Sequence, residues 1–210
     1  MTTQILPWSS SLQGLPLLRE THPDWIAVAR ADLRALLVDH AHCEQKAASQ
    51  ALSLIGRFPE DGELVRSMVG LAAEEMRHFR RVLDWIDRRG ESLTRPAPDP
   101  YVQELRSWSF RRPGGLGARV DLLLACAFVE ARSCERFRIL AGSLLPEEGE
   151  LRELGGFYLR LADAESRHWE TFRNHALRHG PEEAVAARIC AMADAEAKVV
   201  SRLPVEPRMH

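Results

Sequence analysis

The sequence predicts an all-α protein whose centre is a bundle of four long helices. Apolar residues recur at steps of three and four over most of the 210 residues, which is the spacing of one face of an α-helix. No segment shows the sustained alternation of a half-buried strand. The predicted helices exceed the usual length of about 11 to 12 residues, and such helices need neighbours that bury their apolar faces. We expect one domain, residues 1–210.

The first half of the chain contains an arm and two helices. Residues 1–23 are proline-containing and aperiodic, and we expect an irregular N-terminal arm. From residue 24 to about residue 58 the periodicity predicts one long helix or two nearly continuous ones. Asp61 can cap a second helix, which Gly90 would end.

The second half begins with a connection rich in proline and glycine. Residues 91–117 are expected to form a long crossover between helices two and three, with a short helical piece at about 101–108. The third helix is expected at about 116–143 and the fourth at about 147–179, with a turn at Pro146. Residues 182–202 are expected to add a short C-terminal helix.

Composition narrows the class of function. No apolar run approaches the 18 or so residues of a membrane span, and the N-terminus lacks a basic stretch followed by an apolar one, so a cytoplasmic protein without a membrane partner is expected. The formal net charge of −2 gives no support to a strongly electrostatic nucleic-acid binder. The four cysteines stand singly, without a Cys-x-x-Cys pair for zinc or redox chemistry.

Two copies of a Glu-x-x-His motif stand out, Glu75 to His78 and Glu165 to His168. Residues three apart share a helix face, so each copy offers a carboxylate and an imidazole to one metal ion. A further glutamate precedes each copy on the preceding helix, Glu44 and Glu130.

The positions of these residues match in depth. Glu44 lies 15 residues before Pro59 and Glu75 lies 16 after it, so both are roughly 22 Å from that turn. Glu130 and Glu165 lie 16 residues before and 19 residues after Pro146. A lone Glu-x-x-His is usually a solvated surface pair, but two copies with depth-matched glutamates are hard to obtain by accident.

The six side chains are therefore the candidate metal ligands: Glu44, Glu75, His78, Glu130, Glu165 and His168. Four ionised glutamates and two neutral histidines balance two divalent ions, and this oxygen-rich set suits iron or manganese. No catalytic residue is predicted beyond the metal centre. His40, one turn before Glu44, is either a hydrogen-bond partner of the ligands or, as we favour, a satisfied core or surface histidine. Glu135 is expected to face solvent or to lie behind the ligands, and His42 and His175 are expected on the surface.

Through these six residues the chain resembles the ferritin-like di-iron carboxylate superfamily over about 24–179. Three longer strings resemble the family of tRNA hydroxylases that act on 2-methylthio-N6-isopentenyl-adenosine: 42–48 (HCEQKAA), 74–79 (EEMRHF) and 130–137 (EARSCERF). The resemblance implies an oxygen-dependent monooxygenase that hydroxylates the isopentenyl side chain next to the tRNA anticodon. It further implies two iron ions held by the six ligands, dioxygen as co-substrate, and an external electron donor such as a reductase or a ferredoxin-type protein.

Some alternatives stay open. The same ligand set occurs in iron-storage and peroxide-scavenging members of the superfamily, and a purely structural bundle is a third alternative. A monomer or small homo-oligomer is expected. Cations and aromatics interleave in the crossover, and they either contact the tRNA anticodon loop or anchor the crossover to the bundle: Arg106, Trp108, Phe110, Arg111, Arg112 and Arg119.

Overall fold

The computed structural model describes residues 10–111 and 116–210, and of residues 109–111 only the backbone. Within these ranges the chain forms seven α-helices and no strand, which confirms the all-α prediction: α1 (Trp25–Ala31), α2 (Leu33–Arg57), α3 (Gly62–Arg88), α4 (Pro100–Arg111), α5 (Ala118–Leu144), α6 (Gly149–Arg178) and α7 (Glu182–Val200). The predicted arm and crossover extend beyond the described residues at 1–9 and 112–115.

The helix ends follow from local chemistry. Asp32 separates α1 from α2, and its side chain accepts a hydrogen bond from the backbone N–H of Ala35 at 2.9 Å. Asp61 caps α3 in the same way, as predicted. At the end of α3, Gly90 adopts a φ of 69°, and the N–H of Glu91 donates to the carbonyl of Ile86 at 3.1 Å. Glycine reaches this left-handed conformation without steric cost, so the helix ends there.

The helices group into two compact units. One consists of Ala27–Pro98 and Glu206–Met209 and holds α2 and α3. The other consists of residues 10–26, Asp99–Val205 and His210, and holds α4 to α7. Helix α1 contributes residues to both units. The expectation of a single domain stays a prediction.

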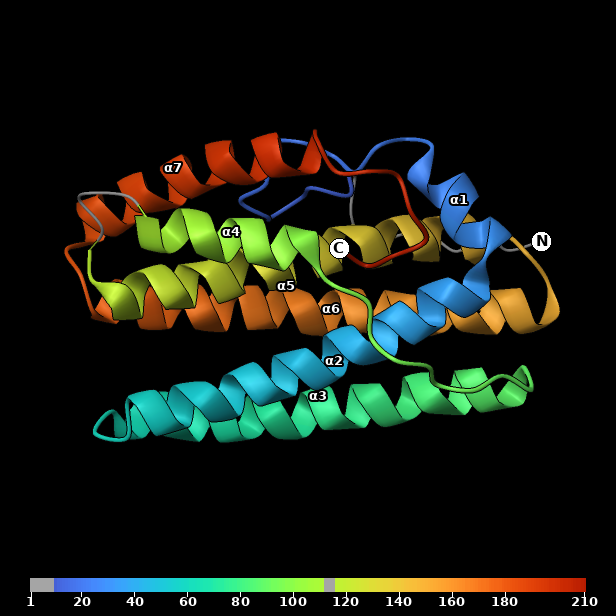
Figure 1. The fold of residues 1–210 in the computed structure, drawn as a ribbon, viewed down its shortest axis with the longest axis horizontal. Coiled ribbons are helices and arrows are strands. Elements are labelled where there is room, and N and C mark those ends of the chain that lie inside the picture. The colour runs from blue at the N-terminus through green and yellow to red at the C-terminus, as the bar shows by residue number, and fades with distance from the viewer. Residues whose placement is uncertain (1–9, 112–115) are drawn as a thin grey trace. The chain divides into compact units, whose positions relative to one another are not determined.

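In the α2–α3 unit the two helices form an antiparallel hairpin (Figure 1). Leu36 and Leu54 of α2, and Leu64 and Met68 of α3, are fully buried. The extended segment after α3 is tied back to α2, because His42 Nε2 lies 2.7 Å from the carbonyl oxygen of Thr94. A stable hairpin of this kind fixes the height at which side chains of α2 and α3 meet.

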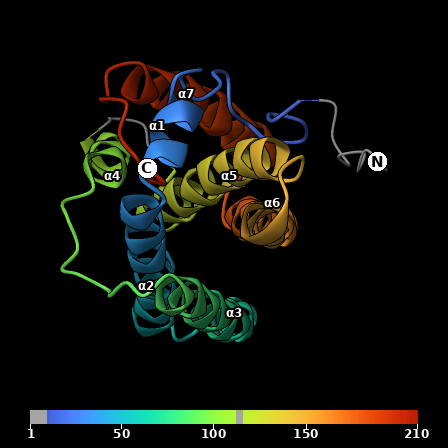
Figure 2. The ribbon, with the colours of Figure 1, turned by 90° about the vertical axis from the view of Figure 1, so that its right-hand side faces the viewer.

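In the α4–α7 unit, α5 is the central helix. Figure 2 shows α4, α6 and α7 on different sides of it, and all three contact it. Helix α5 accordingly buries side chains around its whole circumference, as a helix surrounded by others must. Near the start of α6 its backbone lies close to the residues that follow α5. A Cβ added at Gly155 would lie 2.7 Å from the backbone nitrogen of Leu145.

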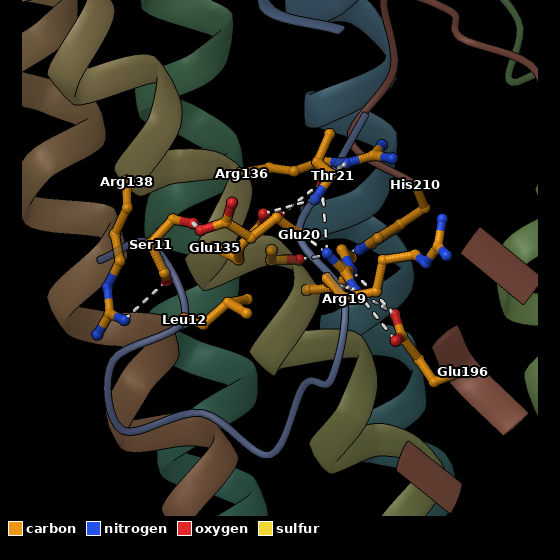
Figure 3. A network of polar contacts seen from close by, with 12 residues as sticks. Ser11, Leu12, Arg19, Glu20, Thr21, Glu135, Arg136, Arg138, Glu196 and His210 are labelled. Atoms are coloured by element: carbon orange, nitrogen blue, oxygen red, sulfur yellow. Dashed lines mark hydrogen bonds and ion pairs between the residues drawn. The ribbon is translucent and has the colours of Figure 1, made fainter. Parts of the chain in front are cut away.

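A buried polar network joins the N-terminal arm, α5 and α7 in the same unit (Figure 3). Arg132 of α5 donates to Glu196 of α7 and to Glu135, one turn further along α5. Glu135 in turn accepts hydrogen bonds from the backbone N–H and the hydroxyl of Thr21 at 2.8 and 2.6 Å. The expectation that Glu135 faces solvent or lies behind the ligands does not anticipate this role, because the carboxylate is fully buried and anchors the arm.

Candidate metal centre

The α2–α3 unit brings three predicted ligands together. One ligand atom from each of Glu44, Glu75 and His78 lies within 4.8 Å of the others. His78 Nδ1 is 3.3 Å from Glu75 Oε2 and 3.7 Å from Glu44 Oε2. All three side chains are buried. The imidazole therefore faces both carboxylates through the same nitrogen.

The α4–α7 unit holds the other three. One ligand atom from each of Glu130, Glu165 and His168 lies within 4.8 Å of the others, and all three side chains are buried. His168 Nδ1 is 3.1 Å from Glu165 Oε2. The second Glu-x-x-His motif thus repeats the geometry of the first, with Nδ1 turned toward the glutamate one turn before it.

Each trio fits one divalent ion by its chemistry. Two carboxylates and one neutral imidazole carry a charge of −2, which balances one divalent cation. At bond lengths of about 2.1 Å, two ligands of one ion lie roughly 3 to 4 Å apart, so the separations within each trio need little adjustment. Buried carboxylates without a counter-charge would cost several kcal/mol or take up protons. Each trio therefore has the charge and the donor atoms that could hold one divalent ion.

His40 is a hydrogen-bond partner of a candidate ligand, which is the less favoured of the two alternatives that the sequence left open. Its Nε2 lies 2.6 Å from Glu44 Oε1, and its side chain is fully buried. The interpretation as a satisfied core or surface histidine is thus incomplete, because the partner that satisfies it is a candidate ligand. The spacing of four residues on one helix was the available signal.

Two expectations for other histidines are wrong. His42 and His175 were expected on the surface, yet 6% and 5% of their surface is exposed. Neither sequence neighbourhood signals this burial, which depends on packing between segments distant in the chain. His42 contacts the extended segment through Thr94 rather than a metal ligand.

Trp108, one of the aromatic residues predicted in the crossover, contacts another helix of its unit. The guanidinium of Arg188, on α7, lies 4.5 Å from the centre of the Trp108 ring and also pairs with Asp121 at 2.8 Å. This stack anchors α4 to the rest of its unit. The side chains of Phe110, Arg111 and Arg112 lie outside the described residues.

No helix among the described residues is both long and apolar enough to span a membrane. The fold places this chain in the class of ferritin-like helical proteins, and each trio offers the carboxylate and imidazole atoms that could hold a metal ion. A solved structure supports the class: "Protein 43 with aldehyde deformylating oxygenase activity from Synechococcus" shares 32% identity at a TM-score of 0.80, over 92% of this chain and 94% of that one.

Sequence comparison gives the family. The chain belongs to the family described as tRNA-(MS[2]IO[6]A)-hydroxylase (MiaE), which matches residues 12–210. A relative from Pseudomonas putida, named tRNA 2-(methylsulfanyl)-N(6)-isopentenyladenosine(37) hydroxylase, is 37% identical over 98% of this chain and 95% of its own length. A relative of the same name from Salmonella typhimurium is 27% identical over 89% of this chain and 84% of its own length.

Proposed function

We propose that this chain is a di-iron monooxygenase that hydroxylates the isopentenyl side chain of 2-methylthio-N6-isopentenyladenosine next to the anticodon of tRNA. Family membership supports the substrate. The observation that carries the chemistry is the pair of buried trios, each with two carboxylates and one imidazole. Because one fold can host many activities, the type of reaction is inferred from the side chains of the site.

The six ligands form one di-iron centre in this proposal, and residues 1–210 form one domain. Glu44, Glu75 and His78 provide one half, and Glu130, Glu165 and His168 provide the other. When bound, iron supplies the activation of dioxygen that attack on a C–H bond of the isopentenyl group requires. The overall reaction places one oxygen atom in the new C–O–H group and the other in water, and it consumes two electrons and two protons from outside.

The protein's own contribution is orientation and the exclusion of water. In both motifs the glutamate one turn before the histidine keeps Nδ1 turned toward the trio. Phe128 precedes Glu130 by two residues and Trp169 follows His168, and their rings meet edge to face with centroids 6.4 Å apart. Both rings are buried, and they are candidates for the apolar surroundings that a prenyl group requires.

The proposal implies partners as well. The anticodon loop of tRNA presents the modified base, and a reductase or ferredoxin-type protein supplies electrons. Because tRNA is the substrate, the protein would work in the cytoplasm, as a monomer or small homo-oligomer. Storage of iron needs a cage of many copies, so a small assembly would distinguish this function from that alternative.

Nucleoside analysis tests the function. The tRNA of cells with and without the gene is digested and its nucleosides are identified by mass spectrometry. We expect the hydroxylated nucleoside only when the gene is present, and its isopentenyl precursor to accumulate otherwise. Unchanged nucleosides, together with rapid peroxide consumption by the purified iron-loaded protein in the absence of tRNA, would instead establish the scavenging alternative.

A further inference from the structure

His40 and Glu44 lie one helical turn apart on α2 and are joined by a short hydrogen bond. Nε2 of His40 is 2.6 Å from Oε1 of Glu44. Neither side chain is accessible enough for water to replace the contact, with 0% and 5% of the side-chain surface exposed. An ionised carboxylate can only accept, so Nε2 carries the hydrogen and donates it.

This contact divides the two oxygens of Glu44 between two tasks. Oε1 accepts from His40, whereas Oε2 lies 3.7 Å from Nδ1 of His78 and thus faces the other two members of the trio. A carboxylate held by one oxygen has lost most of its freedom to rotate. It is pre-organised to bind an ion through the other oxygen, without the entropic cost of being ordered at that moment.

The other unit offers an internal contrast. Glu130 occupies the position in α5 that Glu44 occupies in α2, and the residue four before it is Cys126. Cys126 is buried and carries a thiol where α2 carries an imidazole. A neutral thiol is a much weaker hydrogen-bond donor than an imidazole N–H. The two halves of the ligand set therefore differ in what lies one turn before the glutamate.

We propose that His40 is a positioning residue for the ion of the α2–α3 trio: by holding Oε1 of Glu44 it presents Oε2 alone to the metal, and it strengthens binding at this trio selectively. The inference rests on the proposed function, since it assumes that the trio holds iron. Hydrogen bonds to a ligand of this kind typically change metal affinity by roughly ten- to a hundred-fold.

Ferrous-ion binding by the full-length chain tests the proposal. The protein is titrated with Fe²⁺ in the absence of oxygen, in competition with a chromogenic chelator, and circular dichroism monitors the fold. His40→Phe keeps an aromatic ring but removes the donor, whereas His40→Gln retains an N–H that can reach Glu44. His42→Gln is the matched control, because His42 is a buried histidine of the same helix whose hydrogen-bond partners are the Thr94 carbonyl and the Gln45 side chain.

We expect two ions in the unsubstituted protein and in His42→Gln. In His40→Phe one ion should bind as before and the other roughly ten- to a hundred-fold more weakly, with most of the loss recovered in His40→Gln. If His40→Phe does not fold, His40→Leu serves as the donor-free variant. Equal binding of both ions by a folded donor-free variant, or an equal loss in His42→Gln, would overturn the role of His40.

The same experiment separates this inference from the proposed function. If the wild-type chain binds two ions and hydroxylates tRNA, and the His40→Phe variant binds both ions equally tightly, only the proposed role of His40 is wrong. A wild-type chain that binds no iron defeats both.

Discussion

Arg132 and Glu196 form a two-pronged ion pair inside the α4–α7 unit. Nε of Arg132 donates to Oε1 of Glu196 at 2.9 Å and Nη2 donates to Oε2 at 3.0 Å, and neither side chain reaches solvent. Burial by itself would lower the pKa of Arg132, but the charges of Glu196 and Glu135 hold it above its ordinary value. Tyr101 adds a hydrogen bond to Oε1 of Glu196 at 3.1 Å. The pair joins α5 to α7.

Replacing Arg132 by methionine should be among the most destabilising single changes in the chain. The variant leaves Glu135 and Glu196 buried without a cation, and breaking a buried pair in this way costs about 3 to 5 kcal/mol. Chemical denaturation at neutral pH measures the loss. Arg138→Met is the comparison, because Arg138 is a buried arginine of the same helix whose guanidinium donates to the backbone carbonyls of Ser11 and Gln13. Equal losses in the two variants would contradict the account.

The same variant should depend on pH in a defined direction. Burial already raises the pKa of Glu196 in the intact protein, although Arg132 opposes the shift. Without Arg132 the pKa of this carboxyl group rises further in the folded state, so protonation favours folding. The stability of Arg132→Met is then greatest at low pH and falls as the pH rises through the folded-state pKa. Its deficit relative to the intact protein should be smaller at about pH 5 than at about pH 8.

A pair of adjacent glycines in α6 tests the packing of α5 against α6. Gly155→Ala places a methyl group 2.7 Å from the backbone nitrogen of Leu145, and overpacking of this kind costs typically about 1 to 3 kcal/mol. Gly156→Ala meets only the end of the flexible Arg160 side chain at 3.7 Å. That substitution should stabilise the helix by about 0.5 to 1 kcal/mol. Thermal unfolding should therefore shift in opposite directions for these two neighbours.

The sequence predicted the features that depend on local spacing. Helix ends at Asp61 and Gly90 were predictable because capping and left-handed glycine act over a few residues. The pairing of Glu75 with His78, and of Glu165 with His168, was predictable because the helical repeat alone fixes it. The meeting of Glu44 with Glu75 needed only one turn at a known place in the chain.

Features that join distant segments were not predictable. Thr21 and Glu135 are 114 residues apart, and Arg132 and Glu196 are 64 apart, so no short-range pattern relates them. The burial of His175 likewise depends on which neighbours surround α6. His40 is intermediate between these cases: its distance from Glu44 was visible, but whether that face of α2 was buried was not.

The cysteines should differ sharply in reactivity. Cys190 is exposed, whereas burial raises the pKa of Cys134 to about 12, and its thiol donates to the carbonyl of Ala162. At about pH 8 the reactive thiolate of Cys134 is then about one part in ten thousand. A thiol reagent should label Cys190 much faster than Cys134, and Cys190→Ser should remove that fast labelling. Fast labelling of Cys134 in folded protein would show that the packing of α5 against α6 is looser than described.

Substitution of a proposed ligand should affect the hydroxylation activity but not the helical fold. Glu130→Ala or His168→Ala should abolish hydroxylation while leaving helicity nearly intact, because each removes one ligand from the trio and alanine is a good helix former. Far-ultraviolet circular dichroism and tRNA turnover measure the two effects. Glu170→Ala is the matched control, since Glu170 lies on the same helix as His168 but is exposed, and it should keep full activity. Full activity in either ligand variant would remove that residue from the proposed ligand set.

Isotope labelling tests most directly whether the two trios work as an oxygen-activating di-iron centre. Purified protein is loaded with iron, reduced, mixed with tRNA carrying the isopentenyl nucleoside, and exposed to ¹⁸O₂. We expect two irons per chain and a hydroxylated nucleoside whose added oxygen comes from the labelled gas. Protein that holds two irons but leaves the nucleoside unchanged, or a product whose oxygen comes from water, would contradict this expectation.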